Sequence, residues 1–156
     1  MSSEILRVGI VQENPVVGDV EGNTKLAISR IKLLLEKEKP DLVVFSEMFL
    51  TGYPPEDLLY RDDFLVDVNK ALNYLSQISP NIYIVIGYPR KHKQKLFNAA
   101  GVLHQGTLKY EYFKQELPNY KVFDEKRYFS PGKGPCLINI KDRVLGLTIC
   151  EDIWYA

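Results

Sequence analysis

The sequence predicts an α/β domain, because β-branched runs alternate with amphipathic helical segments through its first half. Residues 7–12, 42–45 and 82–87 are apolar runs of strand length. The segment between the first two runs carries apolar residues at helical spacing: Ala27, Ile28, Ile31, Leu34 and Leu35. Strands that alternate with helices favour parallel pairing, so we expect a mixed sheet with its parallel strands first.

The two helices of this first half are bounded by capping and breaking residues. Asn23 or Thr24 could cap the first helix, and Pro40 stops it. After a turn-rich loop at 51–55, the acids at 56 and 57 suit the first turn of a second helix. We expect that helix to continue to about Ile78, where Ser79-Pro80-Asn81 breaks it.

The second half predicts antiparallel additions to the same sheet. Residues 97–104 and 107–113 read as one hairpin joined through Gln105-Gly106. Residues 137–140 and 144–150 read as a second hairpin around 141–143. The polar, aromatic and turn-rich stretch between the hairpins, 114–133, is typical of a functional loop.

Composition excludes several classes of protein. Hydrophobic residues make up 46% and charged residues 26%, as in a globular domain, and the formal net charge is zero. The absence of a basic excess argues against nucleic acid or an anionic membrane as a partner. Residues 1–7 lack the features of a signal peptide, and no apolar stretch approaches the roughly 20 residues of a membrane helix. Cys136 and Cys150 make no disulfide scaffold, so we expect reduced thiols and a cytoplasmic location.

The chain ends at Ala156, shortly after its best nucleophile candidate and without a polar tail. We therefore expect residues 1–156 to be a partial domain of a longer protein.

Three residues of complementary chemistry each end a strand-like run. Cys150 follows Leu147-Thr148-Ile149, Glu47 follows 42–46, and Lys114 follows 109–113. A thiol, a carboxylate and an ammonium could serve as nucleophile, general base and oxyanion partner. Each has a plainer reading: a lone cysteine is more often a buried hydrophobe, and strand-end charges are usually solvated.

The neighbours of these residues bear on that choice. Glu151 and Asp152 would raise the pKa of the Cys150 thiol unless a cation such as Lys114 intervenes. A buried Lys114 would need a carboxylate beside it, and Glu47 and Glu125 are available.

Other kinds of site are disfavoured. His92 and His104 lie in unrelated segments and no cysteine or histidine pair has ligand spacing, so we expect no metal. No histidine is placed for a Cys-His dyad, which leaves a carboxylate as the base. No phosphate loop, dinucleotide fingerprint or nucleophile-elbow serine is present, and Gly132-Lys133-Gly134 reads as a turn.

Taken together, these motifs resemble the nitrilase superfamily of carbon-nitrogen hydrolases. The matching strings are Val8-Gly-Ile-Val-Gln12, Leu42-Val-Val-Phe-Ser-Glu47-Met, Phe113-Lys114 and Thr148-Ile-Cys150-Glu-Asp. Two longer strings, 51–59 and 117–129, are similar to the glutaminase domains of bacterial glutamine-dependent NAD synthetases. The resemblance implies an αββα sandwich, of which this chain would form about the first half, a mixed sheet with helices on one face.

The resemblance also implies roles for particular residues. Cys150 would attack the side-chain amide of L-glutamine, with Glu47 as general base. Lys114 and the backbone N–H of Glu151 would hold the oxyanion. Glu125 would be the supporting second glutamate, and Tyr120 would line the glutamine pocket.

One expected partner follows from the same resemblance. This partner is a synthetase domain of the same parent chain, which would bind ATP and Mg outside this segment. A homo-oligomer is expected for a different reason, because half of such a sandwich would expose one face of its sheet. No cofactor is expected within residues 1–156.

Two alternatives remain open. The chain could belong to a stand-alone amidase or carbamoylase of the same superfamily. It could instead be a non-catalytic piece that only folds or associates, since an exposed sheet face would favour self-association and leave it inactive alone.

Overall fold

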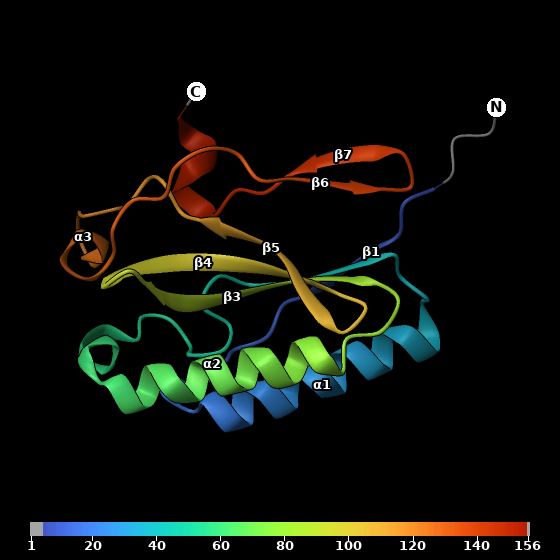
Figure 1. The fold of residues 1–156 in the computed structure, drawn as a ribbon, viewed down its shortest axis with the longest axis horizontal. Helices are drawn as coiled ribbons and strands as arrows, with labels where there is room; N and C mark the ends of the chain where they lie inside the picture. The colour runs from blue at the N-terminus through green and yellow to red at the C-terminus, as the bar shows by residue number, and fades with distance from the viewer. Residues whose placement is uncertain (1–4, 156) are drawn as a thin grey trace.

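Five strands form one mixed sheet in the order β1-β2-β3-β4-β5 (Figure 1). β1 to β3 pair in parallel, and β4 and β5 add in antiparallel fashion. The computed structural model describes residues 5–155. Residues 1–4, on which the predicted absence of a signal peptide partly rests, and Ala156 lie outside the described residues. The strands are β1 (Val8–Val11), β2 (Leu42–Phe45), β3 (Tyr83–His92), β4 (Lys95–His104) and β5 (Thr107–Phe113).

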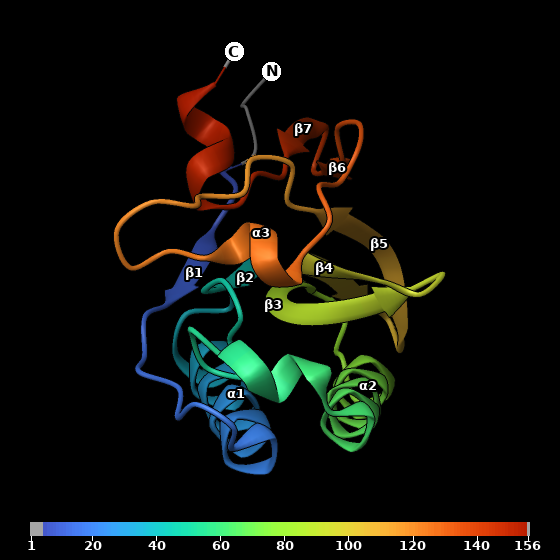
Figure 2. The same cartoon turned by 90° about the vertical axis from the view of Figure 1, so that its left-hand side faces the viewer.

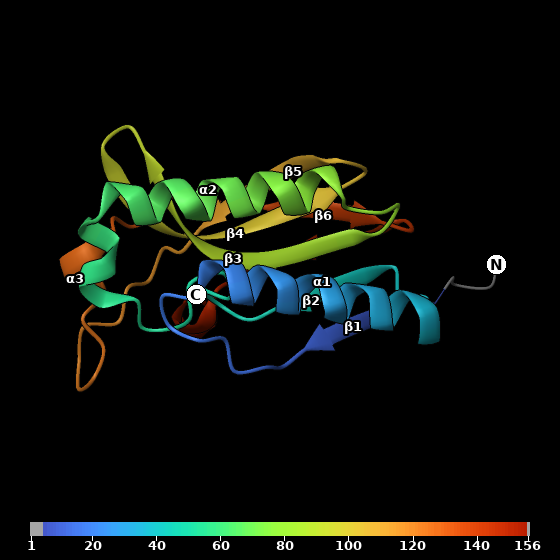
Figure 3. The same ribbon diagram turned by 90° about the horizontal axis from the view of Figure 1, so that it is seen from below.

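Both long helices, α1 (Val20–Lys37) and α2 (Asp62–Gln77), cover the same face of this sheet (Figures 1 and 2). Viewed from below, they lie side by side and run roughly along the strands (Figure 3). The alternation within the strands explains this layering. In β2, Val43 and Phe45 join the core under the helices, whereas Leu42 packs in a separate cluster on the opposite face. The predicted α/β class and the placement of helices on one face are confirmed.

The opposite face is covered in part by a hairpin of β6 (Leu137–Ile140) and β7 (Arg143–Gly146). Ile138 and Ile140 are buried with Val85, Val102 and Tyr112 of the main sheet. The prediction that this hairpin extends the main sheet was wrong: it forms a separate two-stranded sheet. The hairpin contacts the sheet through apolar side chains and not through backbone hydrogen bonds.

Several predicted element bounds were also wrong. α1 begins at Val20, because the side chain of Asp19 accepts a hydrogen bond from the N–H of Gly22. Asn23 is instead buried, and it bonds the backbone of Val16 and Leu50. The predicted second helix is interrupted: a 3₁₀ turn, η1 (Glu56–Tyr60), precedes α2, and the extended backbone of Arg61 separates them.

The segment expected as a functional loop contains one short helix, α3 (Glu125–Tyr128). The last strand was predicted to run to Cys150, but β7 ends at Gly146. Cys150 instead begins a 3₁₀ helix, η2 (Cys150–Trp154). Within residues 5–155, no helix is long and apolar enough to span a membrane.

Candidate active site

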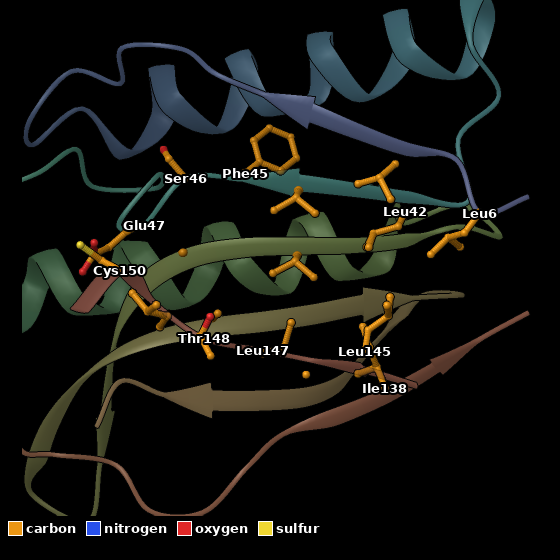
Figure 4. A pocket seen from close by; sticks show the side chains of 17 residues that line it. Leu6, Leu42, Phe45, Ser46, Glu47, Ile138, Leu145, Leu147, Thr148 and Cys150 are labelled. Atoms are coloured by element: carbon orange, nitrogen blue, oxygen red, sulfur yellow. The ribbon is translucent and has the colours of Figure 1, made fainter. Parts of the chain in front are cut away.

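Glu47 and Cys150 line one cleft of ≈ 550 Å³ between the main sheet and the β6–β7 hairpin. Figure 4 shows the two side chains together at one end of it. The rest of the cleft is mostly apolar, with contributions from Leu6, Val8, Leu42, Val44, Val85, Ala100, Ile138, Leu145, Leu147 and Ile149. The polar chemistry is therefore concentrated at a single end.

The sheet topology explains why residues so far apart in sequence meet there. β2 and β3 are parallel, and two antiparallel steps make β5 run in the same direction. The carboxyl ends of β2 and β5 consequently lie at the same edge of the sheet. Glu47 follows β2 by two residues and Lys114 directly follows β5, as the sequence predicted for both strand ends.

Lys114 is the most deeply buried member of the group, with a side chain only 1% exposed. Its Nζ lies 2.7 Å from Oε1 of Glu47 and 3.0 Å from Oε1 of Glu125. Burial by itself lowers the pKa of this ammonium, but the two carboxylates outweigh it and the pKa is raised. The carboxylates that the sequence suggested for a buried Lys114 are both in place, and the lysine is held as a cation.

Glu125, at the start of α3, is buried with a side chain 4% exposed. Burial raises the pKa of its carboxyl group, while hydrogen bonds from Lys114 and from the hydroxyl of Tyr53 oppose that shift. The Tyr53 hydroxyl lies 2.9 Å from Oε1. Oε2 of Glu125 is buried with no hydrogen-bond partner. Glu125 therefore supports Lys114 through this ion pair and does not itself line the cleft.

Asn98 is a site residue that the sequence analysis missed. Its side chain is fully buried in β4, and Nδ2 donates to Oε1 of Glu47 at 2.5 Å. Its backbone carbonyl accepts from the N–H of Lys114 at 2.9 Å. The available signal was a single amide side chain within the otherwise apolar run of Phe97, Ala99 and Ala100.

The turn that carries Glu47 is packed tightly against β3. A Cβ on Gly87 would lie 2.4 Å from the backbone nitrogen of Met48 and 2.6 Å from the carbonyl oxygen of Ser46. Met48 has a φ of 54°, a left-handed conformation that is unusual for a side chain of its size. Only glycine at position 87 leaves room for this turn, which fixes where the Glu47 side chain leaves the backbone.

Cys150 begins η2 and does not end a buried strand, so the predicted placement was wrong. The residue is exposed and has a φ of 45°. A non-glycine residue in this region costs about 1–3 kcal/mol and is often found at functional turns. Partial burial of the sulfur, together with Glu47, Glu125 and Glu151, raises the pKa of the thiol, and Lys114 opposes the increase.

These effects mean that the resting thiol holds its proton. Because Glu47 faces it in the same cleft, a carboxylate is available to receive that proton during attack. The sequence predicted that both Glu151 and Asp152 would raise this pKa. Glu151 does so, whereas the carboxylate of Asp152 accepts hydrogen bonds from Tyr112 and from backbone N–H groups.

Tyr120 and Glu151 belong to a neighbouring hollow of ≈ 590 Å³. The Tyr120 hydroxyl donates to Oε2 of Glu151 at 3.0 Å. Lys126 and Glu116 also line this hollow, so it carries charges of both signs. Tyr120 is thus not in the cleft of Glu47, but its partner Glu151 directly follows the candidate nucleophile.

Within residues 5–155, no group of three or more histidine, cysteine, aspartate or glutamate side chains could hold a metal ion. His104 stacks on the ring of Tyr83, with centroids 4.0 Å apart, and its Nδ1 bonds the carbonyl of Ile82. His92 is exposed at the end of β3. Neither histidine belongs to the Glu47 cleft or to the neighbouring hollow.

Comparison with protein families gives a match to the carbon-nitrogen hydrolase family over residues 7–156. The chain is 44% identical over 151 residues to the glutamine-dependent NAD(+) synthetase of Thermotoga maritima, covering 96% of the chain and 26% of that protein. It is 39% identical to the enzyme of the same name from Xanthomonas campestris, covering 100% of the chain and 29% of that protein.

The fold has close counterparts among solved structures. Glutamine-dependent NAD+ synthetase from Acinetobacter baumannii superposes with a TM-score of 0.90 at 35% identity, over 96% of this chain and 28% of that one. An amidase from a Nesterenkonia species superposes with a TM-score of 0.84 at 20% identity, over 99% of this chain and 59% of that one. The second match concerns the fold alone. The chain spans between a quarter and a third of the length of the synthetases it matches.

Proposed function

The chain belongs to the carbon-nitrogen hydrolase family, and we propose that it is the glutamine-hydrolysing part of an NAD(+) synthetase. The observation that carries the proposal is the position of Lys114. Its buried ammonium lies between Glu125 and Glu47, and Glu47 lines the same cleft as Cys150. A cation in that place suits an oxyanion that forms beside the thiol.

The first step is attack of the Cys150 sulfur on the side-chain amide carbon of L-glutamine. The thiol proton passes to Glu47, and the carbonyl oxygen becomes an oxyanion. Two of the three N–H groups of Lys114 are directed to Glu47 and Glu125. The third N–H and the backbone N–H of Glu151 would donate to the oxyanion.

Collapse of this intermediate breaks the carbon–nitrogen bond. Glu47 returns its proton to the departing nitrogen, ammonia leaves, and a γ-glutamyl thioester remains on Cys150. Glu47 then takes a proton from water, which attacks the thioester carbon. The products are glutamate and a regenerated thiol, so a single carboxylate serves both halves of the reaction.

The hollow beside Glu151 suits the amino-acid end of glutamine. Lys126 could complement an α-carboxylate, while Glu116 and Glu151 could complement an α-ammonium. Tyr120 would line this part of the pocket, in contact with Glu151.

The ammonia would serve amidation of an adenylated deamido-NAD by a synthetase portion of the same protein. ATP and Mg would bind in that portion, and no cofactor is proposed for residues 1–156. Two of the named synthetases, from Thermotoga maritima and Xanthomonas campestris, support this assignment through their similarity over nearly the whole chain.

Replacing Cys150 with alanine tests the proposal in the complete gene product. We expect Cys150→Ala to abolish glutamine-dependent synthesis and glutamine hydrolysis, while synthesis from added ammonia continues. Equal loss of both activities would remove Cys150 from the assigned role. Hydrolysis of other small amides or N-carbamoyl compounds in preference to glutamine would favour a stand-alone amidase instead.

A further inference from the structure

The carboxylate of Asp152 accepts four hydrogen bonds. Oδ2 accepts from the hydroxyl of Tyr112 at 2.7 Å and from the N–H of Ile149 at 3.0 Å. Oδ1 accepts from the N–H of Gln115 at 3.0 Å and from the N–H of Glu116 at 2.8 Å. Both oxygens are therefore engaged twice, which is the full acceptor capacity of a carboxylate.

These donors lie on both sides of the candidate active site. Ile149 directly precedes Cys150, whereas Gln115 and Glu116 directly follow Lys114. Tyr112 lies in β5, the strand that ends just before Lys114. A single side chain thus ties the backbone that carries the thiol to the backbone that carries the ammonium.

The conformation of Cys150 shows why such a tie is needed. Its φ of 45° persists only where the surroundings fix the backbone. Asp152 supplies that constraint locally, because its N–H donates to the carbonyl of Ile149 at 3.1 Å while its side chain accepts from the Ile149 N–H.

We propose that Asp152 is a positioning residue that holds the thiol of Cys150 against Glu47 and Lys114. The proposal deepens the function given above and rests on Cys150 being the nucleophile. Asparagine could not replace aspartate here. Its NH₂ group would take the place of one carboxylate oxygen and would face the two donors that this oxygen accepts from. Burial and the hydrogen bond to Asp152 raise the pKa of Tyr112 to about 12, so the tyrosine remains a donor across the working pH range.

The test reads the position of the thiol without using glutamine. Iodoacetamide alkylation of Cys150 is followed against pH in a Cys136→Ser background, which leaves one thiol in the chain. The charged groups that act on this thiol are Glu47, Glu125, Glu151 and Lys114. Glu47→Gln should shift the alkylation profile to lower pH, because it removes a negative charge that disfavours the thiolate.

Asp152→Asn should release the turn and so uncouple the thiol from these charges. We expect the alkylation profile of Asp152→Asn to move to lower pH. In the double variant, the additional shift caused by Glu47→Gln should be smaller than in the wild-type background, or absent. In the complete gene product, glutamine turnover should fall by about 10²-fold, the cost of a displacement near 1 Å, with little change in KM. An unchanged profile with full Glu47 coupling would overturn the proposal.

Controls separate positioning from stability. Asp142→Asn makes the same change of charge at an exposed turn residue with a φ of 59°, where asparagine is well accommodated, and should leave the profile unaltered. If Asp152→Asn does not fold, Tyr112→Phe decides the question, since it removes one donor and should give a smaller shift in the same direction. A folded Tyr112→Phe with unaltered alkylation and turnover would then overturn it. Alkylation could depend on Glu47 in the wild-type chain and lose that dependence in Asp152→Asn while no protein hydrolyses glutamine. That result would sustain the positioning role and refute only the assigned substrate.

Discussion

The amide of Asn98 donates to the same oxygen of Glu47 that accepts from Lys114, at 2.5 Å and 2.7 Å respectively. Two donors on Oε1 hold the carboxylate group of Glu47 in one orientation. Glu47 lines the cleft with Cys150, so this arrangement leaves Oε2 as the oxygen available to take the thiol proton.

Asn98→Leu should therefore reduce turnover by about tenfold while the protein stays folded. Leucine has a similar shape, and it also removes the buried Oδ1 of Asn98, which has no hydrogen-bond partner. Loss of one neutral donor costs only about 1 kcal/mol of stability when the acceptor keeps another partner. Urea unfolding together with the rate of glutamine hydrolysis checks both parts, and undiminished turnover would make Asn98 a packing residue only.

Lys114→Met should reduce turnover by about 10²–10³ if the ammonium stabilises the oxyanion. The same change leaves two carboxylates near each other without their cation, which costs about 3–5 kcal/mol of stability. Lys114→Met/Glu125→Gln should recover part of that stability without recovering turnover. Recovery of turnover in the double variant would mean that Lys114 acts only by neutralising Glu125.

The reactivity of Cys150 should depend on pH in a defined direction. Its thiol pKa is raised above the ordinary value of 9.0, so thiolate is scarce below that pH and alkylation should keep rising beyond it. Glu47→Gln should increase alkylation at pH 8 while eliminating hydrolysis, since Glu47 disfavours the thiolate and is the proposed base. A decrease in alkylation would show that Glu47 acts on the thiol in some other way.

Gly87→Ala should disrupt the Glu47 turn, because its Cβ would overlap backbone atoms of Ser46 and Met48 that cannot move independently. We expect a loss of about 1–3 kcal/mol in urea unfolding and a matching loss of hydrolysis. Gly146→Ala is the matched control, since its Cβ would meet only Leu137 Cδ2 at an ordinary 3.7 Å. Equal stability of the two variants would contradict this reading of the turn.

The apolar cleft face predicts self-association of residues 1–156. Val8 and Ile10 lie on the edge strand β1 and are 46% and 75% exposed, beside an apolar cleft. Exposed apolar side chains on an edge strand favour association. Light scattering should show oligomers that Ile10→Lys reduces and Val122→Lys, at an exposed loop position, does not. A monodisperse wild-type monomer would contradict the prediction.

Much of this arrangement was predictable from the sequence, because local rules determine it. Apolar, β-branched runs of strand length identified the strands of the main sheet, and the ends of two of those runs identified Glu47 and Lys114. The rules failed where tertiary contacts decide: Asn23 is buried and bonds the backbone of Leu50 instead of capping α1, and the β6–β7 hairpin packs on the sheet without pairing with its strands. Asn98 gains its role from Glu47, and Asp152 gains part of its role from Tyr112, Gln115 and Glu116, all distant in sequence, which no local pattern reveals.

The proposed glutamine hydrolysis is best tested by a search for a glutamyl thioester on Cys150. The chain and the complete gene product would each be mixed with L-glutamine, quenched in acid and analysed by intact mass spectrometry, with Cys150→Ala as control. We predict a γ-glutamyl adduct on Cys150 and release of ammonia in the complete protein, both absent from the variant. Ammonia release that persists in Cys150→Ala would contradict the account.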